Sequence, residues 1–165
     1  MTIKVIHKII AAICIVTATS FGSVARSAEY LAGPFEKNLA YSSATITRGG
    51  KVVWLAGTVG LKDENGKDIS NDFEAQVRFI FAKLDKTLKE AGGSLQNMVE
   101  MTVYITDVAN GASFANIRKE FFPSGNYPAS SLVTISHLAF PGMVVEISGT
   151  AVIGDECSAA AACSK

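Results

Sequence analysis

The sequence predicts one α+β domain in which two helices cover one face of a β-sheet. Three observations support this prediction. The chain has 165 residues, of which 48% are hydrophobic and 18% are charged, a composition typical of one globular core. Segments of alternating apolar and polar residues are interleaved with two segments of helical periodicity. The resulting order is β-β-α-β-α-β-β without an internal repeat or linker, and such mixed orders pack helices against a sheet.

The N-terminal segment has the pattern of a secretory signal peptide. The stretch "MTIKVIHK" is short and positive, and "IIAAICIVTATSFGSVA" is an apolar run that ends in small residues. We expect cleavage after Ala25 and export to the periplasm or the medium. We expect no stable membrane anchor, because the strongly apolar part is too short to span a bilayer comfortably. The chain then divides into a signal peptide (1–25), one domain (26–154) and a flexible cysteine-containing tail (155–165).

Charge and cysteine content argue against several classes of function. The chain holds 15 basic and 15 acidic residues, and removal of 1–25 takes away two lysines, which leaves a net charge of −2. A slightly acidic chain is a poor candidate for nucleic-acid binding. The tail cysteines Cys157 and Cys163 form a disulfide in an oxidising compartment or stay incidental thiols, and both alternatives remain open. Two cysteines without a nearby histidine are a poor zinc site, so no metal is expected.

The strand signals fall in five segments: residues 45–47, 52–58, 98–106, 131–136 and 143–154. The first two flank Arg48-Gly49-Gly50-Lys51, which predicts two strands around a tight turn. Alternation within 98–106 places Val99 and Met101 on one face, together with Val103 and Ile105. The opposite face of the sheet is polar or amphipathic rather than charged throughout, which suits an oligomer interface. Its members are Thr102, Tyr104, Glu146 and Ser148.

Two segments have helical periodicity. Residues 73–93 follow N-cap candidates at 70–72, end at Gly92-Gly93, and repeat apolar residues at Val77, Ile80, Leu84 and Leu88. Residues 111–122 form a shorter helix that Pro123 ends, with Phe114, Ile117 and Phe121 on one side. We expect both apolar sides to pack against the sheet.

Generic catalytic motifs are absent: the sequence contains no GxSxG elbow, P-loop, HExxH or GxGxxG. His7 lies in the predicted signal peptide, so His137 alone remains and a histidine triad is excluded. Glu146 lies in the strand segment "MVVEISGTAVIG", which holds no other charge. A carboxylate there costs free energy unless it is paired, hydrogen-bonded or at a pocket edge. An interface hydrogen bond and a functional role fit Glu146 equally well.

Several segments, in this order, resemble the RidA (YjgF, L-PSP) family: "AGPFEKN", "VVWLAGTVGL", "LKEAGGSLQNMVEMTVYITDV", "FANIRKEFFPSGNYPASSLV" and "FPGMVVEISGTAVI". The resemblance covers roughly residues 31–153. It implies a chorismate-mutase-like fold assembled as a homotrimer, with a pocket for a small metabolite at each subunit junction. It also implies hydrolysis of 2-imino or enamine acids, such as 2-iminopropanoate, to 2-keto acids and ammonia. No metal or organic cofactor is implied.

The resemblance assigns site residues by position. Glu146 aligns with the glutamate that positions water, and Phe35 stands where the family has a tyrosine, so that hydroxyl is missing. A polar pocket position falls at Gly57-Thr58, and the asparagine of the second helix aligns with Asn116.

Ser130 is the main departure from the family. The carboxylate-binding arginine of the "PARS" signature is replaced here by Ser130, and Ser131 is an ordinary family residue. A serine hydroxyl offers one neutral donor where arginine offers a fork of charged donors. Lys37 or Arg118 could substitute for the arginine, although we favour ordinary solvated charge as the interpretation of both.

Three functions follow from these observations. The first is an exported imine or enamine deaminase with an altered carboxylate clamp. The second is a non-catalytic trimer that binds a small metabolite in the inter-subunit cleft. The third is a protein-interaction role of the trimer surface. RNA cleavage ranks low, because the chain is slightly acidic and lacks a pair of histidines.

Overall fold

The computed structural model describes residues 28–154. Its main sheet has the strand order β3-β6-β4-β5. These strands are β3 (Lys51–Thr58), β6 (Val145–Ile153), β4 (Met98–Ile105) and β5 (Ala129–Thr134). β6 is antiparallel to both β3 and β4, whereas β5 is parallel to β4. The sheet is therefore mixed.

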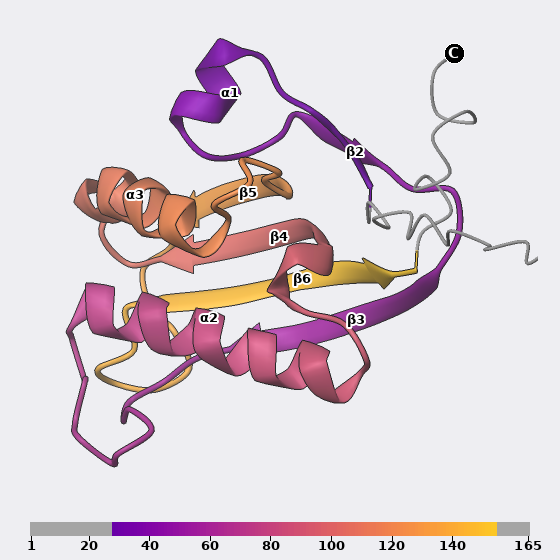
Figure 1. Cartoon of the computed structure of the whole chain (residues 1–165). Helices are drawn as coiled ribbons and strands as arrows, with labels where there is room; N and C mark the ends of the chain where they lie inside the picture. Colours follow the sequence, from indigo (N-terminus) through magenta and orange to yellow (C-terminus); the bar gives the residue numbers. More distant parts are fainter. Residues whose placement is uncertain (1–27, 155–165) are drawn as a thin grey trace, which may run out of the picture.

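Helices α2 (Phe73–Glu90) and α3 (Gly111–Phe121) lie on one face of this sheet (Figure 1). The chain runs from β3 through α2 to β4, and from β4 through α3 to β5. Both connections join parallel strands and step across the sheet in the same direction, so a common handedness puts both helices on one side. The predicted α+β fold with two helices on one face is confirmed. We call the uncovered side of the sheet the open face.

A smaller sheet of β1 (Glu29–Leu31) and β2 (Ala44–Ile46), together with the short helix α1 (Pro34–Asn38), lies beyond β5 (Figure 1). Ser42 attaches this part to the main sheet: it bridges to Ala129, and its Oγ donates to the carbonyl of Tyr127 at 2.6 Å. The predicted strands around the turn at 48–51 both form, but β2 pairs with β1 while β3 pairs with β6. The turn therefore joins two sheets and does not close a hairpin.

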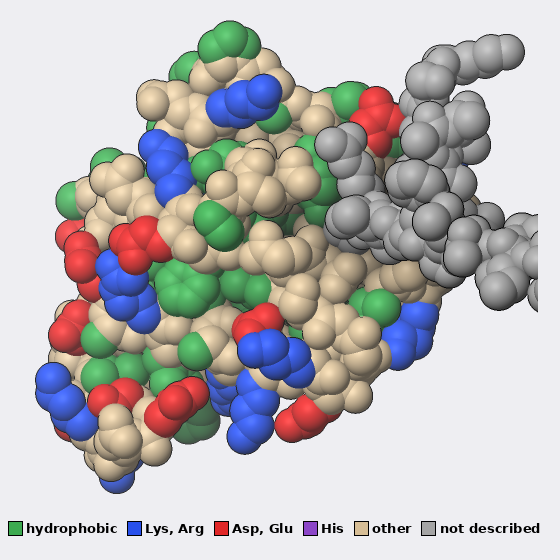
Figure 2. Space-filling view, in the orientation of Figure 1, with side chains coloured by type: hydrophobic (Ala, Val, Ile, Leu, Met, Phe, Trp, Pro, Cys, Tyr) green, Lys and Arg blue, Asp and Glu red, His purple; other side chains and the backbone are tan. Residues whose placement is uncertain are grey.

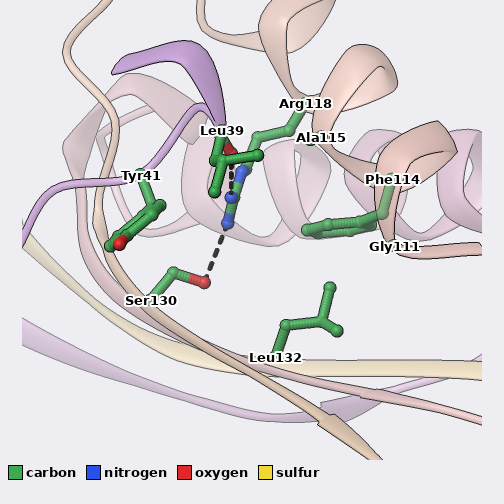
Figure 3. A pocket seen from close by; sticks show the side chains of 8 residues that line it. All are labelled: Leu39, Tyr41, Gly111, Phe114, Ala115, Arg118, Ser130 and Leu132. Atoms are coloured by element: carbon green, nitrogen blue, oxygen red, sulfur yellow. Dashed lines mark hydrogen bonds between the residues drawn. The ribbon is translucent and has the colours of Figure 1, made fainter. Parts of the chain in front are cut away.

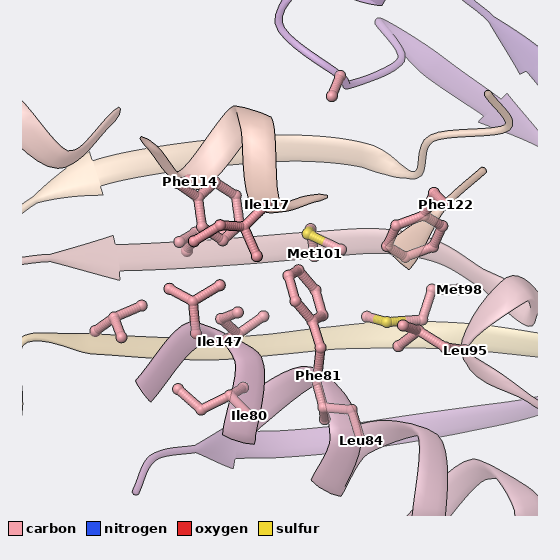
Figure 4. Close-up of a cluster of buried hydrophobic side chains, with 14 of the residues drawn as sticks. Ile80, Phe81, Leu84, Leu95, Met98, Met101, Phe114, Ile117, Phe122 and Ile147 are labelled. Carbon is pink, nitrogen blue, oxygen red and sulfur yellow. The ribbon is translucent and has the colours of Figure 1, made fainter. Parts of the chain in front are cut away.

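The core lies between the two helices and the sheet (Figure 4). The predicted apolar positions of α2 are all buried: Val77, Ile80, Leu84 and Leu88. Phe81 is the centre of an aromatic cluster, with its ring centroid 4.8 Å from that of Phe121, 6.0 Å from Phe114 and 6.1 Å from Phe122. Such a cluster fixes α2 against α3 through large buried apolar areas.

The predicted alternation of β4 is wrong at its first residues. Met98 and Met101 both belong to the main core, whereas Val99 packs with Ala28 and Val152 in a separate cluster. The register with β6 shifts between Met98 and Glu100. A bulge of this kind adds one residue to the strand and reverses the side on which the following residues point. Strict alternation holds from Met101 to Ile105.

Two short 3₁₀ segments, η1 (Leu95–Asn97) and η2 (Val108–Asn110), flank β4. Helix α2 begins after its N-cap residue Asp72, whose Oδ1 accepts a hydrogen bond from the backbone N–H of Ala75 at 3.0 Å. Within the described part of the chain, no helix is long and apolar enough to cross a membrane. The predicted signal peptide and the tail cysteines Cys157 and Cys163 lie outside the described residues.

Candidate functional site

A cavity of about 370 Å³ lies between α3, β5 and the chain that follows α1 (Figure 3). We call it the Arg118 cavity. Its lining residues are Leu39, Tyr41, Gly111, Phe114, Ala115, Arg118, Ser130 and Leu132. Apolar side chains form most of the wall, and the side chains of Tyr41, Arg118 and Ser130 add polar groups. An apolar pocket with a few converging polar groups is the usual form of a small-molecule site.

The guanidinium of Arg118 is the buried cation of this cavity, and the residue is only 3% exposed. Its Nη1 donates to Ser130 Oγ at 2.8 Å, and its Nη2 donates to the carbonyl oxygen of Leu39 at 2.9 Å. Cζ lies 4.9 Å from the centroid of the Phe114 ring. All of these partners are neutral. Among residues 28–154, no acidic side chain pairs with Arg118, and its buried Nε has no hydrogen-bond partner.

Burial lowers the pKa of the Arg118 guanidinium to about 10. The group is still charged at neutral pH. An unpaired charge in such a place costs several kcal/mol as an order of magnitude. The packing of the described residues therefore leaves this cation without a compensating anion, and a bound anion would supply one.

Glu146 lies on the open face, on the side of the sheet opposite to Arg118. Its neighbours in the strand, Val145 and Ile147, point into the main core. β3 changes register against β6 between Leu55 and Thr58, and this bulge brings Gly57 next to the carboxylate. A Cβ on Gly57 would overlap Glu146 Oε1 and lie 2.9 Å from Cδ. The half-buried carboxylate thus fills the space that a glycine leaves free.

The sequence profile of the family described as "Endoribonuclease L-PSP" matches residues 35–153, most of the chain. This chain belongs to that family. The resemblance to RidA, YjgF and L-PSP proteins is thereby confirmed.

Solved structures agree with this membership of the L-PSP family. YyfB of Yersinia pestis, from the conserved Rid protein family, has a TM-score of 0.69 at 23% identity and covers 77% of this chain and 99% of its own; it supports the fold. Rv2704 of Mycobacterium tuberculosis, of the YjgF/YER057c/UK114 family, has a TM-score of 0.54 at 27% identity, over 76% of this chain and 99% of its own. PA3499 of Pseudomonas aeruginosa has a TM-score of 0.56 at 30% identity, over 70% of this chain and 82% of its own.

In this L-PSP-family chain, the site residues expected from the sequence separate into two groups. Gly57, Thr58 and Glu146 come together where β3 meets β6, and the Oγ1 of Thr58 donates to the carbonyl of Ala56 at 3.2 Å. Ser130 lies on the helix-bearing side with Arg118. Ser131 belongs to the open face, where it pairs with Thr102.

Phe35 and Asn116 join neither group. Phe35 lies in α1 and is 67% exposed, and Asn116 is an exposed residue of α3. The neighbour of Asn116, Ala115, lines the Arg118 cavity instead.

The expectation of solvated charge is wrong for Arg118. Lys37 is exposed and lines a different cavity, beside Ser124 and Asn126. Arg118, in contrast, follows Phe114 by four residues, and residues at this spacing share one side of a helix. The feature of the sequence that indicates burial of Arg118 is thus its place on the apolar side of α3. The helix-bearing side otherwise carries acidic and basic side chains intermixed on its surface (Figure 2).

Proposed function

We propose that this chain is an imine or enamine deaminase whose site is completed by a second copy of the chain. The position of Glu146 is the observation that carries this proposal. Its carboxylate is half-buried against Gly57 and, within residues 28–154, accepts no hydrogen bond. A carboxylate in such a place can bind and polarise a water molecule.

The reaction needs a water molecule, a proton acceptor and a proton donor. For a 2-imino acid, the water oxygen attacks the C=N carbon while Glu146 accepts a proton from the water. Glu146 passes this proton to the nitrogen, and a carbinolamine forms. The carboxylate then takes the hydroxyl proton and passes it to the nitrogen, so that the C–N bond breaks, the C=O bond forms, and ammonia and a 2-keto acid are released. An enamine enters the same sequence after protonation at carbon. Correct placement of the water and the imine supplies much of the acceleration.

The proposed site requires a second copy of the chain because Glu146 and Arg118 lie on opposite sides of the sheet within one copy. The open face carries exposed apolar side chains in addition to Tyr104: Trp54 is 81% exposed, and Val52 and Val133 are also exposed. Large apolar groups on one face are typical of a surface that another chain covers. In a homotrimer, the open face of one subunit then meets the Arg118 cavity of its neighbour.

A non-catalytic trimer that binds a metabolite or another protein is the second candidate. The observations that favour it are the phenyl ring of Phe35 and the hydroxyl of Ser130 at positions where the family has tyrosine and arginine. RNA cleavage, which the family's description suggests, has less support. His137 is the only histidine outside the predicted signal peptide, and it is exposed.

Ammonia release from freshly generated 2-iminopropanoate and 2-iminobutanoate tests the proposed activity. We expect the wild-type chain to accelerate release, and Glu146→Gln to lower that acceleration by about 10²-fold or more. Equal melting temperatures and equal masses of the two proteins serve as the control for folding. No acceleration by the wild type, combined with thermal stabilisation by small carboxylates, would favour the non-catalytic trimer.

We also propose that the domain acts after export. The support is the charged, then apolar, then small-residue pattern of residues 1–25. Mass spectrometry of the protein recovered from a bacterial periplasm should give a mature chain that begins at Arg26. An intact N-terminus in the cytoplasmic fraction contradicts export.

A further inference from the structure

We propose that Arg118 and Ser130 together form the anion-binding subsite of the Arg118 cavity, and that its ligand is a small monocarboxylate with a short apolar tail. The link of this subsite to imine hydrolysis rests on the proposed function. The claim about binding rests on the cavity alone.

The bonding of Arg118 is incomplete for a purely structural residue. A guanidinium has five N–H donors and a full positive charge. The described residues use both donors of Nη1, one for Ser130 Oγ and one for Met101 Sδ at 3.6 Å, and one donor of Nη2 for the Leu39 carbonyl, which leaves the N–H of Nε and the second N–H of Nη2 without a partner. A residue that served only to tie α3 to α1 and β5 could do so with a neutral donor. The unpaired charge therefore points to a function beyond packing.

Ser130 and Arg118 act as one unit. The Ser130 hydroxyl accepts from Nη1 at 2.8 Å, so its own proton remains to be donated into the cavity. In Figure 3 the guanidinium reaches from α3 toward Ser130, between Leu39 and Phe114. An arginine at position 130 would start from the strand and bring a second cation into the same space. The serine thus leaves room for one cation, and the helix supplies it.

The walls of the cavity define the class of ligand. The one full charge among its lining residues is that of Arg118, and apolar side chains surround it: Leu39, Phe114, Ala115 and Leu132. A single carboxylate finds one positive charge and a hydroxyl donor there, whereas a second carboxylate or a phosphate would lose water without a second cation. A short hydrocarbon tail gains by burial against the apolar wall. We therefore expect 2-oxobutanoate to bind better than 2-oxoglutarate or inorganic phosphate.

Titration calorimetry with 2-oxobutanoate tests the subsite, on the chain that lacks only the predicted signal peptide. We expect Arg118→Met to weaken binding by about tenfold or more, and Ser130→Ala to weaken it severalfold, because both remove donors to the carboxylate. Lys37→Met is the matched control; it removes an exposed cation that lines another cavity, and the affinity should stay unchanged.

The double variant Arg118→Met/Ser130→Arg gives the sharper result. It moves the one cation from the helix to the strand, so binding should return to within a few-fold of wild type. Ser130→Arg alone places two cations together and should give no additive gain. If Arg118→Met does not fold, Arg118→Lys and Ser130→Ala provide the comparison, since Arg118→Lys keeps the charge and loses the fork.

Two results would overturn the subsite: wild-type affinity in a folded Arg118→Met protein, or equal affinity of the wild type for 2-oxobutanoate and inorganic phosphate. Binding that depends on Arg118 without ammonia release would support the subsite and count against the deaminase. Ammonia release that is unaffected by Arg118→Met would support the deaminase and count against the subsite.

Discussion

The carboxylate of Glu146 occupies the space that a side chain at position 57 would need, since a Cβ on Gly57 would lie 2.9 Å from Glu146 Cδ. Gly57→Ala should therefore push the carboxylate away from its place. We expect the rate of ammonia release to fall by about 10²-fold with little change in melting temperature, because the glycine is on the open face and the carboxylate is a flexible end. Ala56→Ser, at the exposed neighbouring residue, should leave the rate unchanged. An unchanged rate in Gly57→Ala would show that this placement of Glu146 has no part in the reaction.

Gln76 joins three segments through one buried amide. Its Nε2 donates to the carbonyls of Ile69 at 2.9 Å and Gly142 at 2.7 Å, and its Oε1 accepts from Val144 N at 3.0 Å. Gln76→Leu leaves these backbone groups without partners and should lower the free energy of unfolding by about 2–4 kcal/mol. Denaturant unfolding measures the loss. Lys86→Gln, on the exposed side of α2, should stay within about 0.5 kcal/mol of wild type, and an equal loss in both variants would contradict the account.

Asp85 gives stability a dependence on pH. Partial burial alone would raise its pKa, but hydrogen bonds from Lys89 and from the backbone N–H of Leu95 outweigh it and hold the pKa below its usual 3.8. A lowered pKa means that the stabilisation is complete above the unfolded-state value and is lost as pH falls through the folded-state value. The difference in unfolding free energy between wild type and Asp85→Asn should therefore shrink between neutral pH and about pH 2. A constant difference would assign the effect to something other than the charge.

Trp54 should be a contact between subunits, because it is 81% exposed on the open face. Light scattering at micromolar concentration should give a trimer for the wild type and a smaller mass for Trp54→Glu, since a charge there prevents apolar burial. Val108→Glu changes another exposed apolar residue, which is 75% exposed and lies in η2 outside the strands of the sheet, and should leave the trimer intact. A monomeric wild type would remove the basis for a site shared between chains.

The parts of the fold that could be predicted from sequence depend on local periodicity. The apolar repeat from Val77 to Leu88 determines the buried side of α2, and alternation after Met101 determines the two faces of β4. The pairing of β2 with β1 and the bulge before Met101 depend on contacts between distant segments, which no local pattern records.

The candidate site, like the fold, could be predicted from the sequence only in part. Glu146 could be found from sequence because a lone acid in an apolar strand is unusual. The charge of Arg118 predicts a solvated side chain, whereas its four-residue spacing from Phe114 predicts a place on the apolar side of α3, and the structure agrees with the spacing. The separation of Glu146 and Arg118 onto opposite sides of the sheet follows from the order β6-β4-β5 and from the side on which each residue points. This separation could therefore be seen only in the folded sheet and could not be predicted from the sequence.

Complementation between two inactive variants is the most direct test of a site shared by two chains. Glu146→Gln and Arg118→Met each remove one side of every site, so at a substrate concentration below saturation neither protein alone should exceed about a tenth of the wild-type rate. After mixed refolding, random assembly places an intact Glu146 beside an intact Arg118 at about one quarter of the junctions. We predict that ammonia release returns to about one quarter of the wild-type rate. A mixture as inactive as its two components would contradict the shared site.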